Sequence, residues 1–103
     1  MADKRRFAWY RQRKERGFDD RETWCLHMTI AKFALPRLKR FKEVGCGYPM
    51  DLTSEKWDKI LDDIIYAMEI SADDHKWYLD TTDDKRVNRG CKLFGQYFFN
   101  LWW

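Results

Sequence analysis

Two stretches of the sequence combine fixed positive charges with aromatic rings. The first holds Arg37, Lys39 and Arg40 and is followed by Tyr48, and the second contains Trp9 and Arg13. Guanidinium and ammonium groups pair with phosphates, while aromatic faces stack on nucleobases. We therefore predict that these six residues bind an anionic ligand that contains a nucleobase. The alternative is that the rings face a core and the cations are only solvated.

Groups suited to catalysis or metal binding are few. His27 has no other His, Cys or acid beside it at a ligand spacing. Asp73, Asp74 and His75 resemble a metal-ligand cluster, but without a hard-cation loop pattern a solvated helix end is the better interpretation. The sequence has no glycine-rich phosphate loop, Ser–His–Asp order or nucleophile elbow. We expect a binding protein and not an enzyme, with no catalytic residue, metal or cofactor.

The charge is unevenly distributed along the 103 residues, which predict a single domain (1–103). Residues 1–50 hold thirteen Lys/Arg against six Asp/Glu, whereas residues 51–103 hold seven against eleven. This asymmetry favours an anionic partner or head-to-tail self-association, unless the two halves neutralise each other across the fold. The three cysteines lack a CxxC spacing, which indicates reduced thiols. Neither a membrane span nor a signal peptide is evident, so we expect the cytoplasm and no membrane partner.

The elements that would position these residues are predicted from hydrophobic spacing. Residues 53–71 place apolar side chains in one broad helical stripe from Trp57 to Met68, with Thr53 as the cap. A helix starting with the capping box of Asp19 and Glu22 runs through an apolar stripe to Leu38. Because proline removes an N–H and clashes with the preceding turn, this helix should kink or break at Pro36 and redirect the cations beyond it.

The last helix is predicted from Thr82 as its cap and from an apolar face. That face comprises Val87, Cys91, Phe94, Phe98 and Leu101. Aromatic residues beyond this face exceed what a small monomer can bury, so Phe99, Trp102 and Trp103 are expected in an interface. We predict a homo-oligomer, a dimer or higher, since closed two-fold pairs are the commonest assembly.

Two segments remain open. Residues 1–18 form either a short basic helix ended by Gly17 or an arm, and residues 72–84 look like a loop with one turn at Trp77. No strand pattern with hairpin signals is present. The predicted fold is therefore all-α, a small bundle of three main helices with a basic N-terminal element.

The spacing of several motifs resembles a family of small phage-encoded accessory proteins without assigned chemistry. The family pattern has a Trp in the first helix, an LPRL segment, a Pro before LT, an acidic Trp-containing helix and a closing LF..YF..LW. It is matched over about four-fifths of the chain, leaving out the basic N-terminus, by these residues: Trp24, Leu35–Leu38, Pro49, Thr53, Trp57, Leu93, Phe94, Tyr97, Phe98, Leu101 and Trp102. The resemblance implies a phage protein acting in the host cytoplasm, against host antiviral defence.

Combining the resemblance with the basic residues, we expect stoichiometric sequestration of an anionic nucleotide immune signal. Two alternatives stay open. One is a protein inhibitor that blocks a host defence enzyme through the aromatic tail or the acidic surface of residues 51–84. The other is an accessory protein that binds nucleic acid along the basic half.

Overall fold

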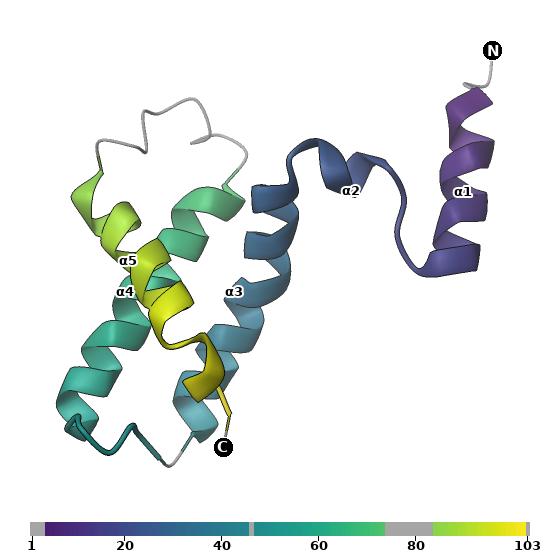
Figure 1. Ribbon diagram of the computed structural model, residues 1–103. Coiled ribbons are helices and arrows are strands. Elements are labelled where there is room, and N and C mark those ends of the chain that lie inside the picture. Colours follow the sequence, from purple (N-terminus) through teal and green to yellow (C-terminus); the bar gives the residue numbers. More distant parts are fainter. Residues whose placement is uncertain (1–3, 46, 74–83, 103) are drawn as a thin grey trace.

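A computed structural model describes residues 4–45, 47–73 and 84–102, which form helices and no strands. The elements are α1 (Lys4–Arg16), α2 (Arg21–Trp24), α3 (Leu26–Val44), α4 (Ser54–Ala72), α5 (Lys85–Gln96) and a 3₁₀ turn, η2 (Phe98–Asn100). This confirms the all-α prediction. Helices α3, α4 and α5 form the bundle, and α1 and α2 form an arm that reaches away from it (Figure 1).

Helix α4 lies at the centre of the bundle and packs against both α3 and α5. Its predicted stripe is buried, with Trp57, Leu61, Ile64 and Met68 inside. The predicted cap is also present, since the Thr53 side chain accepts a hydrogen bond from the Lys56 N–H at 3.2 Å. Thr53 satisfies one of the free N–H groups of the first turn, so local sequence sets where α4 begins.

Helix α5 differs from the prediction in its cap, its buried face and its end. The cap is Asp84, whose side chain accepts from the N–H groups of Arg86 and Val87. Thr82 and the expected loop around Trp77 lie outside the described residues. Cys91 and Phe98 are exposed, so their place on the core face is wrong. The helix ends at Gln96 before η2 instead of continuing to Leu101.

The close packing at Gly90 explains why the buried face of α5 differs from the predicted one. Gly90 is buried, and a Cβ there would lie 2.2 Å from the Asp63 carbonyl oxygen and 2.6 Å from the Ala67 Cβ. The two helix backbones therefore approach each other at this glycine. Because α5 turns its Gly90 side toward α4, Cys91, one position further around the helix, faces solvent.

Helix α3 is continuous through Pro36, so of the expected kink or break, the break does not occur. Pro36 and Arg37 are exposed, and the Arg37 guanidinium donates to the Phe33 carbonyl oxygen at 2.9 Å. Proline removes the helical donor of the Lys32 carbonyl, four residues back, whereas the Arg37 side chain adds a donor to the next carbonyl along the helix. The interruption occurs instead at Cys25, which separates α2 from α3 with φ −122° and ψ 68°.

The predicted stripe of the first main helix is buried only in its second half. Ala31 and Leu38 are in the core, whereas Trp24, Ile30 and Phe33 are exposed. The first turns of α3 lead into the arm, which extends away from the bundle (Figure 1). This gives the chain an elongated shape, 57 × 32 × 19 Å, with a radius of gyration of 16.7 Å against about 13 Å for a compact chain of this length.

The arm is held by polar contacts around Asp19. This carboxylate is almost fully buried and accepts hydrogen bonds from the Arg13 and Arg21 side chains. Half of the predicted capping box is present: the Asp19 N–H donates to the Glu22 carboxylate at 2.8 Å, but the Asp19 carboxylate accepts from the Arg21 N–H and not from that of Glu22. The helix that it starts is only the four-residue α2. In the described ranges, no helix is long and apolar enough to cross a membrane.

Candidate functional site

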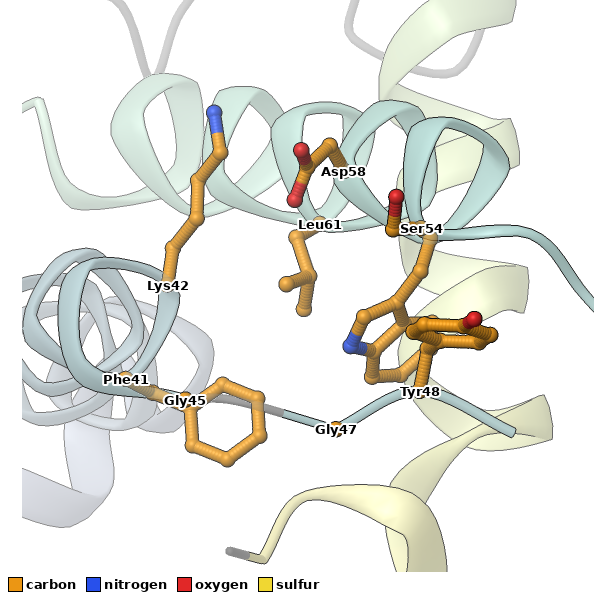
Figure 2. A pocket seen from close by; sticks show the side chains of 9 residues that line it. Phe41, Lys42, Gly45, Gly47, Tyr48, Ser54, Asp58 and Leu61 are labelled. Atoms are coloured by element: carbon orange, nitrogen blue, oxygen red, sulfur yellow. The ribbon is translucent and has the colours of Figure 1, made fainter. Parts of the chain in front are cut away.

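A pocket of about 270 Å³ lies between the end of α3, the following loop and the start of α4 (Figure 2). Tyr48, one of the predicted ligand-binding residues, lines it. We call it the Tyr48 pocket, and its lining residues are Phe41, Lys42, Gly45, Gly47, Tyr48, Ser54, Trp57, Asp58 and Leu61. Its volume is just below the range of about 300 to 1,000 Å³ that accommodates drug-sized ligands. It therefore has room for one ring system.

The polar groups of the Tyr48 pocket are few and come from opposite walls. Figure 2 shows Lys42 on the α3 side and Ser54 and Asp58 on the α4 side. The Lys42 ammonium is 2.6 Å from Asp62, so its charge is already compensated. Asp58 is exposed and has no cationic partner among the described residues. The pocket thus offers a carboxylate acceptor and a hydroxyl beside aromatic surface.

Trp57 adds an unused donor to this pocket. Its side chain is only 5% exposed and contacts the Tyr97 ring edge-on, with centroids 5.5 Å apart. Its indole N–H has no acceptor in the part of the chain that the structure describes. Since no buried side-chain nitrogen or oxygen lacks a partner among the described residues, this N–H reaches solvent, where a ligand or water can accept from it.

A second hollow, of about 360 Å³, adjoins the Tyr48 pocket at Phe41, which lines both. We call it the arginine hollow, and its other lining residues are Arg37, Arg40 and Val44. The Arg40 guanidinium is 3.1 Å from Glu43, but both side chains are about two-thirds exposed or more. Such surface pairs contribute little, so Arg40 remains able to bind an anion. Arg37 stacks on Phe33 at 3.8 Å.

The structure brings together three of the six predicted ligand-binding residues. Arg37 and Arg40 share the arginine hollow, and Tyr48 lies in the neighbouring pocket. Lys39 does not line either hollow and pairs instead with Glu69 on α4 at 3.3 Å. Trp9 and Arg13 belong to the arm, so they do not belong to this site.

Trp9 and Arg13 have other partners inside the arm. The Trp9 ring has the Arg21 guanidinium 4.3 Å from its centroid and meets Trp24 edge-on at 6.0 Å. Arg13 binds Asp19. Hydrogen bonds from Arg21 and then Arg13 hold the pKa of the Asp19 carboxyl well below its usual range, despite the opposing effect of burial. Both residues therefore fix the arm in place.

An open hollow of about 770 Å³ lies where the arm meets α3 and is lined in part by Arg13, Arg21 and Phe33. Its two arginines already bind the buried Asp19 carboxylate. Since their charge is used internally, this hollow is a weaker anion site than the arginine hollow.

The other sequence candidates occupy the surface. Phe99 and Trp102 are 89% and 76% exposed, which leaves them available for an interface, and Trp103 lies outside the described residues. His27 is exposed on α3. Asp74 and His75 also lie outside the described ranges, within which no three His, Cys, Asp or Glu side chains gather as a metal site would require.

Sequence reasoning missed Phe41, Trp57 and Asp58 as site residues. Trp57 was assigned to an apolar stripe, and Phe41 lies three residues beyond Leu38, where the described stripe of its helix ended. The signal that links them is the glycine-rich segment 45–49, because a tight connection from α3 to α4 brings both helix ends to one pocket.

Comparisons with protein-family models, curated proteins and solved structures gave no match.

Proposed function

We propose that this protein binds a nucleotide stoichiometrically, with the base in the Tyr48 pocket and the phosphate at the arginine hollow. The observation that carries the proposal is that Phe41 lines both hollows. Aromatic rings and unused hydrogen-bonding groups on one side suit a nucleobase, and two guanidinium groups on the other suit a phosphate. A preformed pocket of this kind needs no catalytic group in order to sequester its ligand.

The wider role that we propose is counteraction of host antiviral defence by a phage accessory protein in the host cytoplasm. The resemblance described above supports it. An anionic nucleotide immune signal would match the ring-and-phosphate character of the site. Binding alone would then remove the signal from its receptor, in proportion to the amount of protein made.

Calorimetry against a panel of cyclic and linear nucleotides tests the proposal. Arg40→Glu should weaken binding by tenfold or more, because a charge-assisted hydrogen bond of about 1.5–3 kcal/mol is replaced by repulsion. Tyr48→Ala should weaken it by a similar factor through lost stacking. Lys92→Glu makes the same charge change on an exposed position of α5 and should have no effect. Absence of binding for every nucleotide would refute the proposal.

A second candidate function is inhibition of a host defence enzyme. The exposed rings of Phe98, Phe99 and Trp102 favour it, because large exposed aromatic patches usually mark interfaces. The same surface would serve a homodimer, the assembly expected from sequence. Light scattering at micromolar concentration separates the two uses. If the wild type has the mass of a dimer and Trp102→Ser that of a monomer, the surface serves self-association. A monomer that retains a host enzyme in a pull-down supports the inhibitor.

A further inference from the structure

The basic residues of α1 are not matched by acids in the way that those of the bundle are. In the bundle, three acidic residues of α4, namely Asp62, Asp63 and Glu69, pair with cations of α3 and α5. Helix α1 holds seven Lys/Arg and one Glu. Two of its cations, Arg13 and Arg16, bind Asp19 and Asp20. Within the described residues, no ion pair joins the acidic half of the chain to Arg13 or Arg16 of this helix, which pair with acids of the arm.

The contacts of α1 divide it into two sides. Trp9, Gln12, Arg13 and Arg16 recur at helical spacing and contact the segment of residues 18–24. This inner side fixes α1 to α2. The opposite side, which we call the outer face, carries Lys4, Phe7, Tyr10, Arg11 and Lys14, with Glu15 at its edge.

The outer face combines three cations with two exposed rings. Phe7 is 66% and Tyr10 is 55% exposed, and the Lys14 ammonium lies 5.0 Å from the Tyr10 centroid. Lys4 and Arg11 have no acidic partner within the described residues. No residue of α1 is buried, and Figure 1 shows the helix apart from the bundle, so this face meets no other part of the described chain.

The charge order of α1 is unfavourable for an isolated helix. Its first turn contains Lys4, Arg5 and Arg6 and no acid, although the N-terminal end of a helix favours negative charge. Like charges at spacings of three and four residues add repulsion, as between Arg11 and Lys14. An extended polyanion along the outer face would remove both penalties at once, whereas a single phosphate would reach only part of it.

We propose that the outer face of α1 binds single-stranded nucleic acid, with phosphates at Lys4, Arg11 and Lys14 and bases stacked on Phe7 and Tyr10. Binding sites for single-stranded nucleic acid combine cations placed along the phosphate backbone with aromatic rings on which any base can stack. Exposed rings favour a single strand over a duplex, whose bases are already stacked. This inference goes beyond the nucleotide site, because it uses a separate helix and none of the pocket residues.

Fluorescence anisotropy with a labelled dT oligonucleotide tests the proposal on the full chain. Affinity should fall roughly 20-fold between about 50 and 200 mM salt if three phosphates are contacted. The triple variant Lys4→Gln, Arg11→Gln, Lys14→Gln should lower the slope of log affinity against log salt by about two. The control removes three exposed bundle cations, Lys56→Gln, Lys59→Gln and Lys92→Gln, and should keep most of the affinity.

The rings provide the second arm of the test. Phe7→Ala with Tyr10→Ala should reduce affinity for the oligonucleotide by about tenfold and leave affinity for heparin, a polyanion without bases, unchanged. Unaltered melting of both variants would show that the bundle is intact. The proposal is overturned if the oligonucleotide does not bind at low salt, or if either α1 variant binds it like the wild type. Mononucleotide calorimetry on the same variants reports separately on the Tyr48 pocket.

Discussion

The bundle and the arm of this molecule bury opposite kinds of side chain. Among the described residues, every buried hydrophobic side chain belongs to α3, α4 or α5, whereas the buried residue of the arm is an aspartate, Asp19. The bundle is therefore stabilised by removal of apolar surface from water, which salt affects little. The arm is positioned by ion pairs and cation–ring contacts, which weaken as salt rises. Stability and the placement of α1 can thus be altered separately.

The largest expected effect is on the bundle, at the close approach of α4 and α5. Gly90→Ala would place a Cβ 2.2 Å from the Asp63 carbonyl oxygen, so the helices must separate. Overpacking of this kind costs about 1–3 kcal/mol, and we expect the upper end because the contact is with backbone. Urea unfolding of the variant measures the loss.

Gly95→Ala is the matched control for that experiment. It lies on the same helix, and a Cβ there would have no atom within 4 Å. Alanine should stabilise the helix at this position by up to about 1 kcal/mol, through its higher propensity. An equal loss for both variants would show that the close approach at Gly90 is not what determines the packing.

A smaller effect is expected at the cap of α5, where the bundle itself depends on a charge. Hydrogen bonds from the Val87 N–H above all, and from the Tyr66 hydroxyl, lower the pKa of Asp84 from its ordinary value of 3.8. A lowered pKa means that the stabilisation is present above that value and is lost as the pH falls through the folded-state pKa. Wild-type stability should therefore decline in acid.

Asp84→Asn isolates this contribution, because asparagine caps helices well but does not titrate in this range. The difference in unfolding free energy between wild type and Asp84→Asn should be largest near neutral pH and shrink below pH 3.8. A difference that stays constant from neutral pH into acid would contradict the assignment of Asp84 as a charged cap.

The smallest effect on stability is expected in the arm. Asp19→Ala removes the acceptor shared by Arg13 and Arg21, which should release α1 and leave the melting temperature of the bundle nearly unchanged. Trypsin should then cleave faster after Arg16 and Arg21 under native conditions, because release exposes the connecting backbone. Glu15→Ala removes an equal charge from an exposed position and serves as the control. Loss of bundle stability in Asp19→Ala would mean that arm and bundle are coupled.

The pH dependence of arm release follows from the same carboxylate. Since the pKa of Asp19 is lowered mainly by Arg21, its ion pairs persist from neutral pH down through 3.8 and fail only in stronger acid. The arm should therefore keep its position throughout the physiological range.

Local signals predicted much of the bundle. The stripe of α4 and its Thr53 cap follow from residues a few positions apart, and both were placed correctly. The half of the capping box that is present, from the Asp19 N–H to Glu22, is local in the same sense. Such features depend on helix geometry and need no knowledge of the tertiary structure.

The errors occurred where a distant contact decides the outcome. Cys91 has the right spacing for the core of α5, but the approach of Gly90 to α4 turns it outward. Pro36 has a strong local preference for a break, yet α3 remains continuous with Arg37 bound to the Phe33 carbonyl. The Tyr48 pocket joins two helices and a loop, and spacing within any one of them does not indicate a shared cavity.

The edge-on pair of Trp9 and Trp24 also gives the molecule an intrinsic optical marker. The indole centroids lie 6.0 Å apart on two different helices, with their planes at 76°. Chromophores this close and this inclined share their excited states, which produces a paired circular-dichroism band of opposite signs. Trp57, which contacts Tyr97 in the bundle, does not belong to this pair. Opening of the arm would therefore appear as loss of the couplet, in unlabelled protein and on the timescale of the opening itself.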